Sequence, residues 1–471
     1  MITVLAAVLS GIMFYLAQGF DPVWAAGWLA PVPLLWLAYG KTNLWQVLLA
    51  SAAAVLAGAG YFLQSPYLHL IPPLVIGSAI AVDIVLFCVA IWFARFMQRR
   101  ASPFITLFAF PACVTAFEFL MQLRSPNGTY GSIAYSTMAV PVLIQSASLF
   151  GMYAVTFVMS VFANTVAMAL RFTRDTAAAI GLGAAIFAAN LVFGIVRLAQ
   201  PQPDVLRVAA IVDETAVADS WRAHSLDADL KVTATYAREI RQAAGEGARF
   251  VVTPEGGMAS IPASQTAIVA PLVAAAKDTG VQIIAGFHSD SPPADFALAI
   301  TPDGQVRRYD KRHPVPGLED RFAPGRVSGW LGDGRAMEIC KDMDFPDTIR
   351  SDAAEGIRLV GAPSGDMGID GWQHGIMSVM RAVENGFALV RPAHDGLVFA
   401  SDAQGRLVAL KKDAPTGVTM IVADLPLGPG PTLYTRIGNV FPWLCVIFSL
   451  TLGIGVALKR SAARRPIGAT P

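Results

Sequence analysis

The stretch FALAITPDGQVRRYDK, residues 296–311, predicts a β-hairpin whose second strand ends on Lys311. Pro302-Asp303-Gly304 is a turn sequence between two strand-like runs. Strand-like and helix-like segments alternate on both sides of this hairpin. The predicted strands are 205–213, 248–255, 281–287 and 334–340, and the predicted helices are 225–245, 264–279 and 373–386. This alternation predicts one α/β domain with a largely buried sheet over residues 198–437.

Outside this domain, long apolar runs dominate the sequence. Of 471 residues, 54% are hydrophobic and 15% are charged, whereas soluble globular proteins carry about 25% charged residues. A helix that crosses a bilayer needs about 20 mostly apolar residues. The expected spans are 2–19, 24–40, 45–63, 72–97, 103–122, 142–170, 177–197 and 438–458. The sequence therefore predicts a polytopic α-helical membrane protein with about eight transmembrane helices.

The predicted domains follow from these spans. Residues 1–197 form an N-terminal transmembrane domain of about seven helices, and 198–437 form the α/β domain. Residues 438–458 form a C-terminal transmembrane helix, followed by a basic tail at 459–471.

Basic residues are unevenly distributed between the two ends of the predicted spans. If the N-terminus is cytoplasmic, the short outer loops contain only Arg124. The inner connections and the tail contain Lys41, Arg95, Arg99, Arg100, Arg171, Arg174, Lys459, Arg460, Arg464 and Arg465. Because cytoplasmic loops are enriched in Lys and Arg, we expect residues 198–437 to lie outside the cytoplasm. The net charge of +1 gives no reason to expect a nucleic-acid partner.

Three chemically active side chains end predicted strands: Glu255 in VVTPEGG, Lys311 in the hairpin, and Cys340 in AMEICKDMDFPD (336–347). A thiol becomes a useful nucleophile beside a general base and a cation. Glu255 suits the base if a dry site raises its pKa, and Lys311 suits the cation that stabilises an oxyanion. Each residue also has a structural interpretation, since a Pro-Glu turn often caps a helix and free cysteines are usually buried. Residue types alone leave both interpretations open.

Other catalytic patterns are weaker. The predicted α/β domain has no G-x-S-x-G motif and no Gly-rich phosphate loop. His313, His374 and His394 are candidates to line a site, but none has a partner at metal-ligand spacing, so we expect no metal. Two carboxylates, Asp83 and Glu118, fall within predicted spans, and such residues are often functional. We favour a structural role for Asp83 and leave Glu118 open.

Taken together, PE (254–255), YDKRHPVPGLE (309–319) and IC (339–340) resemble the nitrilase superfamily. The resemblance implies an αββα sandwich with a Glu255–Lys311–Cys340 triad and Glu319 as a supporting second glutamate. The segments GWLAPVPLLWLAYG, NGTYGSIAYSTMAVPVLIQSASLFGMYAVTFVMSVFAN, QHGIMSVMRAVENGFALVRPAHDG and TLYTRIGNVFPWLCV resemble one membrane branch, the apolipoprotein N-acyltransferases.

This resemblance implies an N-acyltransferase without a cofactor. Cys340 would take an acyl chain from a phospholipid and pass it to the α-amine of a diacylglyceryl-cysteine lipoprotein N-terminus. It further implies a location in a bacterial inner membrane, with the catalytic domain on the periplasmic side. The sequence carries no signal for the oligomeric state, and a monomer is the default expectation. A membrane-tethered relative with a different amine acceptor or amidase activity, and a non-catalytic assembly factor, are the alternatives.

The chain departs from the family pattern after the nucleophile. The family has an aromatic residue and then a glutamate there, whereas this chain has Lys341 and Asp342. Asp342 is expected to keep the supporting carboxylate, and Lys341 is expected near the substrate. In PSGDMGIDGWQH (363–374), Trp372 is the candidate for an aromatic lid and His374 for a substrate contact.

Overall fold

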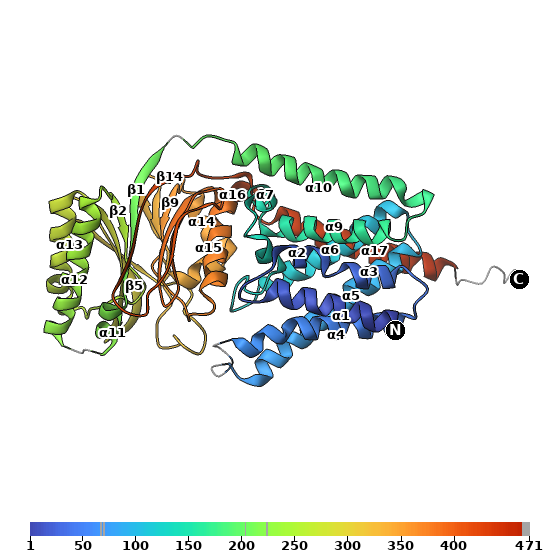
Figure 1. Cartoon of the computed structure of the whole chain (residues 1–471), viewed down its shortest axis with the longest axis horizontal. Coiled ribbons are helices and arrows are strands. Elements are labelled where there is room, and N and C mark those ends of the chain that lie inside the picture. The colour runs from blue at the N-terminus through green and yellow to red at the C-terminus, as the bar shows by residue number, and fades with distance from the viewer. Residues whose placement is uncertain (66–67, 69–70, 203, 223–224, 464–471) are drawn as a thin grey trace, which may run out of the picture.

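The computed structural model describes residues 1–65, 68, 71–202, 204–222 and 225–463. A helical part and an α/β part lie one after the other along the long axis of the molecule, and the C-terminal helix returns into the helical part (Figure 1). Arg464 and Arg465 of the predicted basic tail lie outside the described residues.

The helical part contains most of the apolar sequence. Its helices are α1 (Ile2–Gln18), α2 (Trp24–Leu29), α3 (Val32–Ala38), α4 (Leu44–Gly58), η1 (Ala59–Gln64), α5 (Pro73–Gln98), α6 (Pro103–Gln122), η3 (Ile133–Thr137), α7 (Pro141–Ile144), α8 (Ala147–Phe150), α9 (Met152–Ala169), η4 (Arg174–Thr176), α10 (Ala177–Leu198) and α17 (Val440–Ala463). Among the described residues, five helical segments are long and apolar enough to cross a membrane: Leu44–Gln64, Pro73–Gln98, Pro103–Gln122, Met152–Ala169 and Arg174–Leu198.

Two of the remaining expected spans are shorter than predicted: Ile2–Gln18 and Trp24–Ala38 are apolar but fall below the length of a full span. The helix α17, Val440–Ala463, covers most of the expected span 438–458. The expected span 142–170 was wrong in its first third, because α7 and α8 are short helices and the long helix begins only after Gly151. Gly151 has a φ of 75°, a left-handed conformation that ends one helix and starts another in a new direction.

The α/β part contains fourteen strands in two sheets among the described residues. The strands are β1 (Val205–Asp213), β2 (Phe250–Val252), β3 (Met258–Ala259), β4 (Gln282–Asp290), β5 (Pro293–Ile300), β6 (Val306–Asp310), β7 (Trp330–Gly332), β8 (Arg335–Met337), β9 (Leu359–Gly361), β10 (Ser364–Gly365), β11 (Ala388–His394), β12 (Leu397–Ser401), β13 (Leu407–Lys412) and β14 (Val418–Pro426). One sheet has the order β14-β1-β2-β4-β5-β6 with β3 beside β4, and the other has the order β13-β12-β11-β9-β8-β7 with β10 beside β11.

Helices cover the outer faces of both sheets, which gives an α-β-β-α layering (Figure 1). These helices are α11 (Glu214–Arg222), α12 (Leu226–Gly245), α13 (Gln265–Thr279), α14 (Pro346–Ala353), α15 (Gly371–Asn385) and α16 (Leu433–Ile437), with the 3-10 turn η5 at Cys340–Asp344. Strand β1 shows why the layers form. Ala209 and Ile211 pack towards α12 and α13, while Val208, Ala210 and Val212 pack between the sheets, as the two-residue period of a strand requires.

The second sheet and its helices pack directly on the helical part. One core cluster joins Met377 and Val383 of α15 to Met152 and Val155 of α9. The carboxylate of Glu384 also accepts a 2.6 Å hydrogen bond from the backbone N–H of Met152. Met152 is the first residue of α9, where backbone N–H groups have no partner within the helix. The junction is therefore a continuous core, and it fixes the position of the strand ends above the membrane helices.

Candidate active site

Cys340 is the first residue of the turn η5, and two residues separate it from the end of strand β8 at Met337. Its φ is 38°, a left-handed conformation that is costly for a residue with a Cβ. The backbone holds this conformation, because the N–H of Cys340 donates to the carbonyl of Pro363 at 2.9 Å. The thiol donates to the carbonyl of Gly365 at 3.3 Å. Cys340 is buried but lines a cavity, so its sulfur is held at a fixed and accessible point.

Lys311 follows the last residue of β6, in the hairpin that the sequence predicted. Its ammonium lies 2.5 Å from Glu255 and 2.7 Å from Glu319. A third carboxylate, Asp295, lies 3.3 Å away. Lys311 is 1% exposed, so these contacts are made away from bulk water and are only weakly screened.

Oxygen atoms of Glu255, Asp295 and Glu319 lie within 4.8 Å of one another, a spacing that is able to hold a metal ion. The ammonium of Lys311 contacts all three carboxylates. The compensating positive charge in this cluster is therefore a side chain of the protein.

The cluster shifts the pKa of each member in a definite direction. Burial disfavours the charged form of Glu255, but the Lys311 ammonium outweighs burial and holds the pKa of Glu255 below its ordinary value. The expectation that a dry site raises this pKa was wrong, because it left the cation out. Burial, and then the charge of Glu255, raise the pKa of Asp295 well above its ordinary range. Asp295 therefore holds a proton more readily than Glu255.

The pKa of the other two groups follows the same balance. Burial opposes the ammonium of Lys311, but the adjacent carboxylates raise its pKa well above the ordinary value, so it stays charged. Burial and the charge of Glu255 raise the pKa of the Cys340 thiol well above its ordinary value, although Lys311 acts in the other direction. The resting site therefore holds a neutral thiol beside an ionised glutamate and a charged lysine.

Glu319 is fixed by its own loop. Its Oε2 atom accepts a 2.6 Å hydrogen bond from the backbone N–H of Val315, four residues earlier. The same oxygen contacts the Lys311 ammonium, so the loop after β6 holds Glu319 against the lysine.

Asp342 is fully buried and ties the turn after Cys340 to the segment after Lys311. Its oxygens accept hydrogen bonds from the backbone N–H of Arg312 at 3.0 Å and of His313 at 2.8 Å. They also accept bonds from the Tyr309 hydroxyl at 2.7 Å and the Ile339 N–H at 3.3 Å. Asp342 thus fixes the position of Cys340 relative to Lys311. Because its oxygens are occupied by these hydrogen bonds, we assign it no part in the chemistry.

An Asp342→Ala variant is expected to unfold with about 3–5 kcal/mol less stability, since the backbone N–H groups of Arg312, His313 and Ile339 lose this acceptor at a buried carboxylate. In a domain of this size that corresponds to a melting midpoint lower by about 10 °C. Thermal unfolding in detergent measures it, with Asp424→Ala, which removes an exposed ion pair to Arg207, as the matched control. Equal melting of the two variants would contradict the structural role of Asp342.

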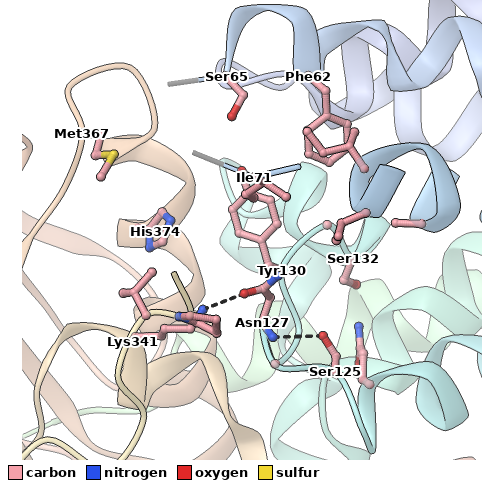
Figure 2. A pocket seen from close by; sticks show the side chains of 18 of the residues that line it. Phe62, Ser65, Ile71, Ser125, Asn127, Tyr130, Ser132, Lys341, Met367 and His374 are labelled. Carbon is pink, nitrogen blue, oxygen red and sulfur yellow. Dashed lines mark hydrogen bonds between the residues drawn. The ribbon is translucent and has the colours of Figure 1, made fainter. Parts of the chain in front are cut away.

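Lys341 points from η5 towards the helical part, where its ammonium donates to the side-chain oxygen of Asn127 at 3.1 Å (Figure 2). His374 lies in the first turn of α15 and lines the cavity, with its ring 5.7 Å from that of Tyr130. Trp372 is placed differently from the expected lid. It is half-buried against the core at the junction, and it is absent from the described lining of the cavity, where Met367 stands instead (Figure 2).

One cavity of about 620 Å³ connects the α/β part with the helical part. Glu255, Lys311 and Cys340 line one end of it. The other end lies between α1, α4, α5 and α6, where Phe14, Val55, Phe87 and Val114 line it. Phe14 and Phe87 meet edge to face there, with ring centroids 5.3 Å apart. The nucleophile therefore opens into an apolar space among membrane helices.

The two intramembrane carboxylates also line this cavity. Glu118 accepts a hydrogen bond from Ser132, which ties the outer end of α6 to the loop above it. Asp83 faces the cavity from the middle of α5.

Comparison with known proteins adds to this geometry. Residues 10–165 match the apolipoprotein N-acyltransferase N-terminal domain, and residues 196–428 match the carbon-nitrogen hydrolase domain. The apolipoprotein N-acyltransferase of Geobacter metallireducens is 24% identical, covering 94% of this chain and 93% of the relative. That of Rhizobium meliloti is 26% identical, covering 95% and 93%.

The chain belongs to the apolipoprotein N-acyltransferase family. Among solved structures, an amidase from Nesterenkonia sp. matches with 24% identity and a TM-score of 0.39, covering 47% of this chain and 90% of the amidase. As a member of the apolipoprotein N-acyltransferase family, the chain is a bacterial membrane protein.

One residue and one ion pair of this family member were missed in the sequence: Asp295, and the pair of Arg391 and Asp366. Asp295 was readable in principle, because counting back from the Pro302-Asp303-Gly304 turn places it opposite Lys311, whose N–H donates to its carbonyl at 3.0 Å. The buried ion pair of Arg391 and Asp366, at 2.6 Å, gave no such signal. Its partners come from two strand ends that only the folded sheet brings together.

Proposed function

We propose that this chain transfers an acyl chain from a phospholipid, through a thioester on Cys340, to the α-amine of a diacylglyceryl-cysteine lipoprotein N-terminus. The observation that carries the proposal is the cavity that Cys340, Glu255 and Lys311 share with Phe14 and Phe87. A soluble substrate does not need an apolar space between membrane helices, whereas a lipid chain does.

In the first half-reaction, the ionised Glu255 takes the proton of the Cys340 thiol while the sulfur attacks the donor's ester carbonyl. The Lys311 ammonium stabilises the charge that develops on the carbonyl oxygen. The carbon–oxygen bond then breaks, Glu255 returns the proton to the leaving oxygen, and a lysophospholipid departs.

In the second half-reaction, the lipoprotein amine attacks the thioester carbonyl. Glu255 takes a proton from the amine, the carbon–sulfur bond breaks, and the sulfur regains a proton as the amide is released. Both substrates are anchored in lipid, so a site at the membrane surface meets them in the same plane.

We further propose the arrangement in the membrane. Residues 1–197 cross it with α1 and the α2–α3 pair as additional spans, and 438–458 add the last, for about eight spans. Residues 198–437 form the catalytic domain on the periplasmic side of the inner membrane, and the protein works as a monomer. In support, the connection between α9 and α10, which contains Arg171, lies at the end of the helical part away from the α/β part (Figure 1).

The activity is expected to stay level through neutral pH and to fall only in acid. Glu255 has a pKa below its ordinary value of 4.5, so it remains an ionised base until the pH drops below that value. A pH profile of the initial rate of Cys340 acylation measures this. A rate that already halves between pH 7 and 6 would contradict the assignment of Glu255 as the base.

The proposal is tested with purified protein, a phosphatidylethanolamine that carries a fluorescent acyl chain, and a synthetic diacylated lipopeptide. The expected result is a hydroxylamine-sensitive label on the protein, followed by transfer of the label to the peptide amine. Label that passes only to water would identify a hydrolase, and no label at all would reject acyl transfer from phospholipid.

A further inference from the structure

Lys341 is a buried cation next to the nucleophile, and the chemical steps above leave it without a role. Its side chain is 7% exposed, yet it lines the same cavity as Cys340. Burying an ammonium costs several kcal/mol unless other groups compensate its charge. The contacts of Lys341 therefore indicate what it is placed to bind.

Those contacts satisfy the ammonium only in part. Its one hydrogen bond goes to the side-chain oxygen of Asn127, at 3.1 Å, and an ammonium has three donors. The nearest carboxylate oxygen, Oδ2 of Asp344, is 3.6 Å away and makes no hydrogen bond of its own. The carboxylate of Asp344 thus offsets the charge of Lys341, but from 3.6 Å, which is too far for a direct hydrogen bond.

Other charges on this side of the cavity are already committed. Asp366 pairs with Arg391 at 2.6 Å. Asp370 accepts from the backbone N–H of Met367 at 2.8 Å and lies 3.5 Å from His374. Of the described residues that line the cavity, Lys311 and Lys341 are the lysines, and Lys311 is already paired with three carboxylates.

Lys341 lies at the depth in the cavity where the headgroup of a bound lipid is expected. Asn127 and Tyr130 belong to the loop after α6, which ends at Gln122 where the helical part meets the α/β part. Figure 2 shows Lys341 beside this loop, with its ammonium directed at Asn127 and with His374 nearby. A lipid whose chain lies among the helices and whose ester reaches Cys340 places its phosphate in this layer, because the phosphate is a few bonds from the ester.

We propose that Lys341 binds the phosphate of the acyl donor and so makes a phospholipid a better donor than an uncharged diacylglycerol. This inference rests on the proposed acyl transfer and adds the group that selects the donor. A lysine suits this role because its ammonium is a compact charge that attracts phosphate without needing a bidentate geometry.

The test measures the first half-reaction alone, as the rate of hydroxylamine-sensitive labelling of Cys340. The donors are phosphatidylethanolamine, phosphatidylglycerol and diacylglycerol with the same labelled chain, in the same detergent micelles. Wild type is expected to favour both phospholipids over diacylglycerol by at least about tenfold in kcat/KM, equivalent to about 1.4 kcal/mol. In Lys341→Met that preference disappears through a higher KM for the phospholipids, and diacylglycerol labelling is unchanged.

Two further variants separate binding from a structural role. Asn127→Ala removes the tie to the helical part but keeps the cation, and it is expected to retain the phospholipid preference. Lys341→Arg is expected to retain most of it. Lys412→Met, at an exposed position on β13, is the matched control.

The outcomes are distinct. Equal loss with all three donors in Lys341→Met, the same loss in Asn127→Ala, or a wild type without donor preference would overturn the inference while leaving acyl transfer intact. No labelling of wild type by any donor would overturn acyl transfer itself. A further arm adds inorganic phosphate: inhibition of wild type that is lost in Lys341→Met supports a phosphate site open to the free ion, and no inhibition with a retained preference supports a lipid-borne phosphate.

Discussion

A Cys340→Ala variant is expected to show no hydroxylamine-sensitive acyl label and no N-acylated peptide. Both half-reactions pass through a bond to this sulfur, so the loss exceeds about 10³-fold. The variant should still fold, because alanine fills most of the volume and the left-handed backbone at this position is held by the hydrogen bond to Pro363. Intact-protein mass spectrometry of the acylated state, with thermal unfolding alongside, measures both results.

The chain offers a sharp control for this variant. The other thiols, Cys88, Cys113 and Cys445, lie in the helices α5, α6 and α17. A variant with these three replaced by alanine, and Cys340 retained, is expected to label at the wild-type rate. Label that persists in Cys340→Ala, or vanishes in the triple variant, would refute the site.

A Lys311→Met variant is expected to lose both activity and stability. Activity falls by about 10²–10³-fold because the developing oxyanion loses its cation. Stability at neutral pH falls by about 3–5 kcal/mol because buried carboxylates lose the charge that compensates them. Glu255, Asp295 and Glu319 all contact this ammonium in the wild type.

The pH dependence of this loss has a definite sign. Without the ammonium, burial raises the folded-state pKa of Glu255 above 4.5, as burial and Glu255 already do for Asp295. A carboxyl group with a raised folded pKa favours folding below its unfolded pKa and loses that contribution as the pH rises. The stability deficit of Lys311→Met relative to wild type should therefore be large at pH 7 and shrink towards pH 4.

Melting curves at several pH values, with the exposed Lys277→Met on α13 as control, measure this deficit. A deficit that grows on acidification would show that the cluster is held by something other than the lysine charge.

Local sequence signals predicted the α/β part closely. Helices expected at 264–279 and 373–386 are found at Gln265–Thr279 and Gly371–Asn385, because apolar periodicity and a terminal glycine mark both. The span 142–170 failed for a related reason: hydropathy records that a segment is apolar but not that Gly151 turns the chain. Apolar character alone therefore left the first third of that span wrongly assigned.

The sequence was sufficient to predict which residue types form the site. It was not sufficient to predict which of their side chains carry charge. Glu255, Lys311 and Cys340 each follow the end of a strand by one to three residues, and a position near a strand end is visible in the sequence. The direction of the Glu255 pKa depends on a 2.5 Å contact with Lys311 that the folded structure reveals. The role of Asp342 likewise depends on donors from Tyr309 and His313, which approach it from another strand end.

The shared core between α15 and α9 has a consequence for how the molecule comes apart. Because Met377 and Val383 are buried against Met152 and Val155, the catalytic layers and the membrane helices belong to one cooperative folding unit. Removing the membrane helices would expose the apolar side chains of α15 that pack against α9, and it would leave the carboxylate of Glu384 without the N–H of Met152. The catalytic part is thus an extension of the membrane part, and separate expression of residues 198–437 would yield an aggregating fragment rather than a soluble enzyme.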